Sequence, residues 1–238
     1  MSIAYTHRRF NQTKDYGDLL FYAPLTNNSI TPLVVPDNNY NILDANNLVW
    51  MNDYTEFYDD SYLIWESSIP TNLPAYTLNC WIDQSEIQGY TFGLYNSQGD
   101  INPNYYSLQN YWHNLTRTSN VMILRNTIYF PSPTVNDLIN SDTINFNTFN
   151  NCLVSIVLLD SQNSTLCYFY INGVYYGNNM MVGLFPTPIY SHPCIGDVVF
   201  RNNETLEGNY SHFSIYVKAM SQQEIINLYY NGGVPPEI

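Results

Sequence analysis

Few side chains in this sequence have the types and spacing that catalysis requires. The four histidines, His7, His113, His192 and His212, are scattered singly. No Ser or Cys lies in a Gly-x-Ser-x-Gly turn, the context that presents a nucleophile in many hydrolases. His212 alternates with Phe213 along an apolar run, so we expect its imidazole to face outward into solvent. The residues themselves give no indication of nucleophilic catalysis.

Acidic side chains offer one candidate metal site. Asp53, Asp59 and Asp60 lie in an Asn-rich stretch and carry the oxygen ligands that Ca²⁺ prefers. Asp- and Asn-rich loops are also ordinary turn chemistry. We therefore assign no metal and no other cofactor, and calcium is allowed by these residues but not supported by them.

Aromatic residues give the positive indication of function. The chain contains 23 Tyr and 4 Trp, and two clusters of them fall in stretches that otherwise look like loops. Tyr and Trp combine a flat apolar body with a polar tip, which suits both protein interfaces and sugar stacking. Capping the open ends of a sandwich is an equally good explanation. The residues predicted to bind a ligand or partner are Tyr58, Tyr62, Trp65, Tyr106 and Trp112.

The charge balance excludes two classes of partner. The chain has 7 Lys and Arg against 20 Asp and Glu, a net charge of −13, whereas nucleic acid and anionic membranes are bound through basic patches. Three of the basic residues, Arg8, Arg9 and Lys14, lie within residues 1–18. We expect this segment to be an assembly arm that pairs with an acidic surface, and a disordered tail is the equal alternative.

Two-residue periodicity predicts the elements that must position these side chains. Runs rich in Tyr, Phe, Ile and Val alternate with Asn, Pro, Gly and Ser clusters, which is typical of an all-β protein. The Asn172-Gly173 pair predicts a type I′ hairpin. Ser221 and Glu224 have capping-box spacing, and Asn231-Gly232-Gly233 follows, so a short C-terminal helix lies between them. The predicted strands cover residues 19–25, 77–82, 121–129, 153–159, 166–171 and 210–217.

Looser stretches separate some of these strands. Residues 26–68 and 98–120 are rich in Asn, and we expect long loops there, with one or two strands near 48–51 and 62–65. The cysteines form no C-x-x-C pair and have no His at a zinc-finger interval, so buried thiols are expected. They are Cys80, Cys152, Cys167 and Cys194.

Four segments together resemble the concanavalin A-like lectin/glucanase superfamily, in particular its laminin-G-like and pentraxin-like branch. Residues 20–25 resemble the opening strand, and 76–82 the strand that ends in a buried Trp. Residues 152–177 are similar to the paired strands around a Tyr/Phe-x-Asn-Gly hairpin, and 194–225 to the closing strand and terminal helix. The resemblance implies an all-β jelly-roll sandwich of two antiparallel sheets with one short C-terminal helix, formed as one domain by residues 19–238.

Two segments depart from the family pattern. The aromatic-His step before the hairpin is replaced by Phe149-Asn150-Asn151-Cys152, and the small-residue-plus-Asp step before the closing strand by Asn209-Tyr210-Ser211-His212. The second change removes an acidic residue, so a family calcium site is not expected.

Glycoside-cleaving relatives with this fold carry carboxylates at alternate positions of one strand, as Glu-x-Asp-x-(x)-Glu. Here Asp83-Gln84-Ser85-Glu86 lacks the first Glu, and the carboxylates between Glu56 and Asp60 have the wrong spacing. We therefore expect no enzyme activity, and solvated turns explain both clusters.

The start of the chain shapes the functional expectation. It begins with Met and shows no signal peptide, although laminin-G-like domains usually work outside cells. Assembly into a virus particle needs no such signal. The sequence therefore predicts a non-catalytic virion component, such as a capsid decoration, head-fibre or tail protein, that binds other virion proteins, itself or glycans. A free carbohydrate-binding lectin is the alternative, and a glycoside hydrolase comes third.

Overall fold

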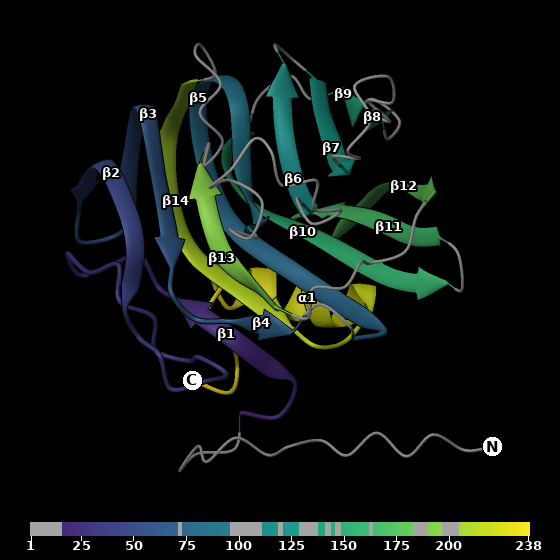
Figure 1. Ribbon diagram of the computed structural model, residues 1–238, viewed down its shortest axis with the longest axis horizontal. Coiled ribbons are helices and arrows are strands. Elements are labelled where there is room, and N and C mark those ends of the chain that lie inside the picture. The colour runs from purple at the N-terminus through teal and green to yellow at the C-terminus, as the bar shows by residue number, and fades with distance from the viewer. Residues whose placement is uncertain are drawn as a thin grey trace, which may run out of the picture.

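The computed structural model describes residues 16–70, 73–95, 111–118, 121–128, 138–140, 144–145, 149–161, 164–182, 190–196 and 205–238. This part of the chain is mostly β, with antiparallel strand pairs and one C-terminal helix (Figure 1). The elements are β1 (Leu19–Ala23), β2 (Ile42–Trp50), β3 (Thr55–Trp65), β4 (Ile69–Pro70), β5 (Ala75–Tyr95), β6 (Tyr111–Thr118), β7 (Val121–Ile128), β8 (Leu138–Asn140), β9 (Ile144–Asn145), β10 (Phe149–Ser161), β11 (Ser164–Ile171), β12 (Val174–Val182), β13 (Tyr190–Gly196), β14 (Thr205–Tyr216) and α1 (Gln222–Tyr230).

Strand β5 lies at the centre of the sheet. It is 21 residues long, so two strands pair with each of its edges: β10 and β6 with one, β14 and β13 with the other. The all-β class and the terminal helix predicted from the sequence are confirmed. Pairing links the described strands into one network, so the division into the two sheets of a jelly roll stays a prediction.

The inner face of the sheet carries the larger hydrophobic cluster. Alternate residues of β5, from Tyr76 through Leu78 and Cys80 to Ile82, point into it, as the two-residue period requires. The rings of Phe21, Trp65 and Phe213 pack together within this cluster. Trp65 lies 5.1 Å from Phe21 and 5.7 Å from Phe213 between ring centroids, and its indole N–H donates to the Ile30 carbonyl over 2.8 Å.

The predicted buried thiols are found at three positions. Cys80, Cys152 and Cys194 are buried and form no disulfide bond, and burial raises the pKa of the Cys80 thiol. The side chain of Cys167 lies outside the described residues. These cysteines fill space in the core as small apolar groups.

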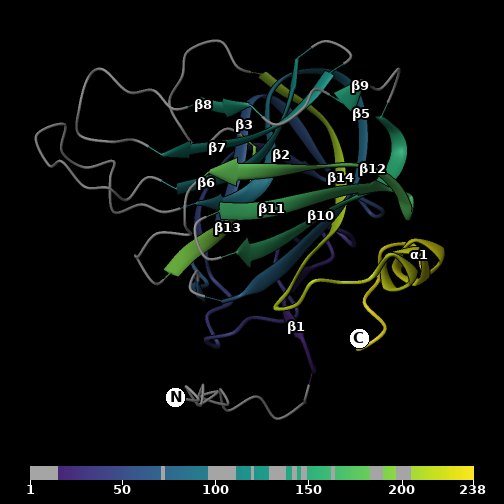
Figure 2. The same ribbon diagram turned by 90° about the vertical axis from the view of Figure 1, so that its right-hand side faces the viewer.

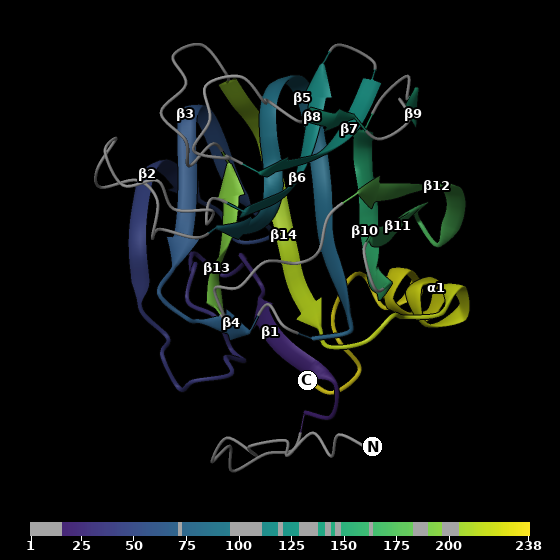
Figure 3. The same cartoon turned by 45° about the vertical axis from the view of Figure 1, so that its right-hand side comes forward.

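Helix α1 covers the opposite face of the sheet. Figures 2 and 3 show it outside the strands, beside the β10–β11–β12 end. Its Ile225 and Leu228 are buried against Leu153, Val157 and Tyr216. The predicted capping box is present, because Ser221 and Glu224 each accept from the other's backbone N–H. No helix in the described part of the chain is long and apolar enough to span a bilayer.

The six predicted strands are all present, and the strands expected near 48–51 and 62–65 are present but longer than predicted. Residues 42–50 and 55–65 form β2 and β3, which pair with each other. β2 is an edge strand with mostly exposed side chains, so burial imposes no apolar alternation on its Asn and Asp residues. In the second predicted loop, residues 111–118 form β6, and residues 98–110 lie outside the described part.

The β11–β12 hairpin has the predicted turn. Asn172 and Gly173 have φ of 51° and 77°, the left-handed values of a type I′ turn. The turn also docks on α1, because a Cβ at Gly173 would lie 2.5 Å from Cγ1 of Ile226. Gln222 donates to the Gly173 carbonyl over 3.0 Å. Glycine is therefore required at this position for two reasons: the turn needs a positive φ, and the contact with Ile226 leaves no room for a Cβ.

We expect Gly173→Ala to destabilise the protein by about 2–4 kcal/mol, because it adds left-handed strain and a clash with Ile226. For a chain of this size, each kcal/mol of lost stability lowers the melting temperature by roughly 2–4 °C. Thermal unfolding followed by circular dichroism should therefore show a clearly lower melting temperature. Gly177→Ala is the matched control, since a Cβ there meets nothing within 4 Å. Equal melting temperatures for the two variants would contradict the docking of the turn.

Candidate functional site

A polar groove opens where β5, β10 and β14 meet the β2–β3 turn. Its volume is about 350 Å³, and it holds aromatic, carboxylate, amide and imidazole groups together. All of its lining residues belong to the described part of the chain. The side chains that give it chemical character are Asp53, Tyr54, Trp81, Asp83, Asn151 and His212.

Two β-bulges shape this groove. In β10 the register against β5 shifts between Phe149 and Cys152, and Asn151 within the shift has a φ of 48°. In β14 the register shifts between Ser211 and Ser214, where His212 has a φ of 52°. A bulge adds an unpaired residue and re-aims its side chain. The two bulges flank the same short segment of β5 from opposite edges.

Trp81 forms the aromatic wall of the groove. Its ring stacks on Tyr229 of α1, with centroids 5.7 Å apart and an angle of 3° between the planes. Its indole N–H donates to Oδ1 of Asn151. The family resemblance predicted a buried Trp at the end of this strand, but Trp81 is only half-buried. Tyr229 of the helix thus packs on one face of the indole ring, and Asn151 of the bulge in β10 holds its N–H edge.

Two carboxylates lie at the groove. Asp83 is two residues after Trp81 on β5, so both side chains leave the same face of the strand. Its Oδ1 accepts from the Asn151 backbone N–H over 3.3 Å. Asp53 is exposed in the β2–β3 turn and makes no ion pair with a described residue. Both carboxylates are open to solvent, which leaves their oxygens free to accept from a ligand.

His212 lies deeper than the sequence predicted. Instead of facing outward, it is half-buried, and its Nδ1 is 2.8 Å from the Tyr22 hydroxyl. Its backbone N–H donates to the Pro24 carbonyl, which anchors the bulge to the segment after β1. Burial lowers the pKa of His212 and raises that of Tyr22. Both groups are therefore neutral at pH 7.

The loop after α1 closes one side of the groove. A Cβ at Gly233 would lie 3.0 Å from Cβ of His212 and 3.4 Å from Cε3 of Trp81, and Gly233 has a φ of +83°. Glycine permits both the close approach and the left-handed backbone. The C-terminal loop thereby holds His212 and Trp81 in place.

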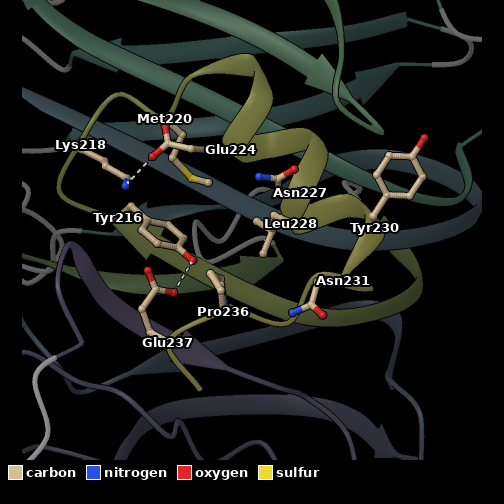
Figure 4. Close-up of a pocket in the computed structure, with 10 residues that line it drawn as sticks. All are labelled: Tyr216, Lys218, Met220, Glu224, Asn227, Leu228, Tyr230, Asn231, Pro236 and Glu237. Atoms are coloured by element: carbon tan, nitrogen blue, oxygen red, sulfur yellow. Dashed lines mark hydrogen bonds and ion pairs between the residues drawn. The ribbon is translucent and has the colours of Figure 1, made fainter.

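A second groove of about 640 Å³ lies between α1 and the C-terminal segment. Its charged groups already have partners, as Figure 4 shows: Lys218 donates to Glu224, and Glu237 accepts from the Tyr216 hydroxyl. Lys218 also lies 3.3 Å from Asp18. Since these groups already have partners, we assign the candidate site to the smaller groove, whose carboxylates form no ion pair with a described residue.

The structure separates the aromatic residues that the sequence grouped. Trp65 is fully buried in the hydrophobic core, so its assignment to a surface binding site was wrong. Trp65 and Leu63 are two residues apart on β3, so both side chains point into the inner cluster. Tyr58 is exposed on the same strand, and the Tyr62 hydroxyl donates to Asp44 over 3.0 Å. Neither tyrosine lines the polar groove.

Other predicted residues cannot be placed in a site. Tyr106 and the proposed arm residues Arg8, Arg9 and Lys14 lie outside the described residues. Trp112 belongs to β6, but its side chain is not among those described. Of the three candidate calcium ligands, Asp53 lines the groove, and the part of the chain described here holds no cluster of three or more His, Cys, Asp or Glu arranged for a metal.

Comparison with known proteins identifies the fold but no family. No protein-family model matches the chain, and no curated protein matches it. Solved structures do match. The binding domain of Paraclostridial Mosquitocidal Protein 1 is 14% identical with a TM-score of 0.59, over 91% of this chain and 52% of that one. The receptor-binding domain of botulinum neurotoxin C/D mosaic serotype is 12% identical with a TM-score of 0.55, over 91% and 52%.

A third match is a structure of botulinum neurotoxin type C, a toxin whose cell entry depends on interaction with two ganglioside molecules. It is 13% identical with a TM-score of 0.54, and again 91% of this chain covers 52% of the other. The chain thus spans about half the length of these structures. At such identities the likeness shows the fold alone, and the superfamily branch stays a prediction.

The ion pair in the second groove makes a pH-dependent contribution to stability. The hydrogen bonds from Lys218 and from the Ser221 backbone lower the pKa of Glu224 to about 2. Because the folded pKa lies below the unfolded value, this stability is present above about pH 4.5 and is lost as pH falls toward 2. Glu224→Gln keeps the cap but loses the charge. We expect it to cost up to about 1 kcal/mol at pH 7, since the pair is partly exposed, and nothing near pH 2.

Urea unfolding of both proteins at several pH values measures this difference. Glu66→Gln is the matched control, because its carboxylate accepts from Asn41 and forms no ion pair in the described residues. A Glu224→Gln difference that stayed constant from pH 7 to pH 2 would contradict the assignment.

Proposed function

We propose that this chain is a non-catalytic carbohydrate-binding domain and that the polar groove is its sugar site. The observation that carries the proposal is the oriented indole of Trp81, which stands beside the carboxylate of Asp83 and the amide of Asn151. A sugar ring has an apolar face for an aromatic ring and a rim of hydroxyls that need donors and acceptors.

The size of the groove fits this class of ligand. Its volume of about 350 Å³ lies within the range of roughly 300–1,000 Å³ that is usual for small-molecule sites. With Oδ1 of Asn151 bonded to the indole, the NH₂ group of this amide is left as a donor to a ligand hydroxyl. Asp83 supplies the acceptor on the neighbouring position of the groove.

The same residues favour binding over cleavage. Glycoside hydrolysis needs one carboxylic acid kept protonated by an apolar enclosure and a second carboxylate across the scissile bond. Asp53 and Asp83 are both exposed, and neither has such an enclosure. A lectin-like jelly roll without catalytic activity is therefore the proposal.

Fold similarity to receptor-binding domains agrees with a binding role. The groove thus favours the lectin over the virion component as the function of this chain. Location in a virion, partners among virion proteins or further copies, the assembly arm and the laminin-G-like branch remain hypotheses that rest on the sequence.

A glycan array followed by calorimetry tests the proposal. We expect Trp81→Ala to reduce affinity for a bound glycan at least tenfold, about 1.4 kcal/mol, because the stacking face is lost. Trp81→Phe keeps a ring against Tyr229 and should retain the fold with an intermediate affinity. Trp50→Ala is the matched control, since this tryptophan is exposed on β2 and does not line the groove.

Two outcomes would overturn the proposal. One is the absence of any glycan bound by the folded protein, or affinity unchanged in Trp81→Ala. The other is release of reducing sugar from a bound oligosaccharide that stops in Asp83→Asn, which would make the groove an active site.

A further inference from the structure

We infer that the polar groove selects uncharged glycans and rejects those that carry a carboxylate, such as sialylated ones. The inference rests on the proposed function and names the ligand class of the same site. The two residues that impose the selection are Asp53 and Asp83, which reach the groove from different elements, the β2–β3 turn and β5.

The negative charge of the groove is not compensated from within. Asp83 accepts from a backbone N–H, which is a neutral donor, and Asp53 forms no ion pair with a described residue. His212 is the one lining group that titrates near neutral pH, but it is half-buried against the Tyr22 hydroxyl, and burial keeps it uncharged. Among the described residues that line the groove, a bound anion would therefore meet two like charges and no opposite one.

The nearest described cation is already engaged elsewhere. Lys218 is the one Lys or Arg whose side chain the structure describes. Its Nζ lies 2.8 Å from Glu224 and 3.3 Å from Asp18, and it lines the second groove rather than the polar one. The net charge of −13 adds repulsion at longer range, which salt screens over about 8 Å at physiological ionic strength.

The same carboxylates attract neutral sugars. Each ionised oxygen accepts strongly from a hydroxyl, because hydrogen bonds to charged groups are roughly twice as strong as neutral ones. A hexose that places its apolar face on Trp81 would direct its hydroxyl rim toward Asp83. A glycan that placed a carboxylate there instead of a hydroxyl would be repelled by Asp83. Such like-charge contacts are a general means of excluding wrong partners.

Paired glycans test the inference directly. The wild-type protein is titrated with the same neutral oligosaccharides with and without a terminal sialic acid, at low and at physiological salt. We expect the neutral member of a pair to bind at least tenfold more tightly, with a difference that shrinks as salt is added. Asp53→Asn, which keeps the shape and removes a charge, should narrow the difference several-fold by improving the affinity for the sialylated member.

The control and the double variant separate the outcomes. Glu66→Gln removes the same charge from a residue that does not line the groove and should leave the preference unchanged. Tighter binding of sialylated glycans by the wild type, or a preference unchanged in Asp53→Asn/Asp83→Asn, would overturn the inference while leaving a sugar site. Binding of neither class would overturn the proposed function and the inference with it.

Discussion

The fold and the groove both depend on the pairing of β5 along its two edges. Because β10 and β14 hydrogen-bond to the same segment of β5, this segment cannot shift without breaking both ladders, and a shift of one residue would exchange its buried and outward side chains. One face of β5 is fixed by the inner cluster. The other face is therefore free to carry polar groups, and Trp81 and Asp83 leave the strand there at alternate positions.

The two tryptophans flanking this region show how burial divides their roles. Trp65 stands among Phe21 and Phe213 with its N–H satisfied by a backbone carbonyl, so its whole surface is used for stability. Trp81 has one face on Tyr229 and its N–H on Asn151. This second arrangement orients a ring without enclosing it. Sequence alone favoured the opposite assignment: Trp65 was grouped with other aromatic residues of an expected loop, and the family resemblance implied a buried Trp81. Only the neighbouring strands decide which of the two rings lies inside.

Local patterns in the sequence were sufficient for much of the fold. The Asn172-Gly173 turn, the capping box of α1 and the six alternating runs depend on residues close together in the chain. The edge strand β2 was predicted only near its end, at residues 48–51, because exposure removes the alternation that identifies the rest of the strand. The groove was missed because its residues come from distant elements and from two bulges, which interrupt periodicity. Both bulges, at Asn151 and His212, fall on the two segments where the sequence departs from the pattern that the resemblance implied.

The acidic residues of the two grooves differ in their hydrogen-bond and ion-pair partners, so they have different roles. Beside α1, Glu224 accepts from Lys218 and from the Ser221 backbone, and Tyr216 donates to Glu237, so negative charge there stabilises the helix end and its attachment to the sheet. In the polar groove the carboxylates face solvent, and burial lowers the pKa of the one imidazole, His212, which lies against the Tyr22 hydroxyl and stays neutral. A protein with so few cations can neutralise only a few of its carboxylates internally. Two of those left over, Asp53 and Asp83, line the polar groove, where the proposed ligand would donate its hydroxyl groups to them.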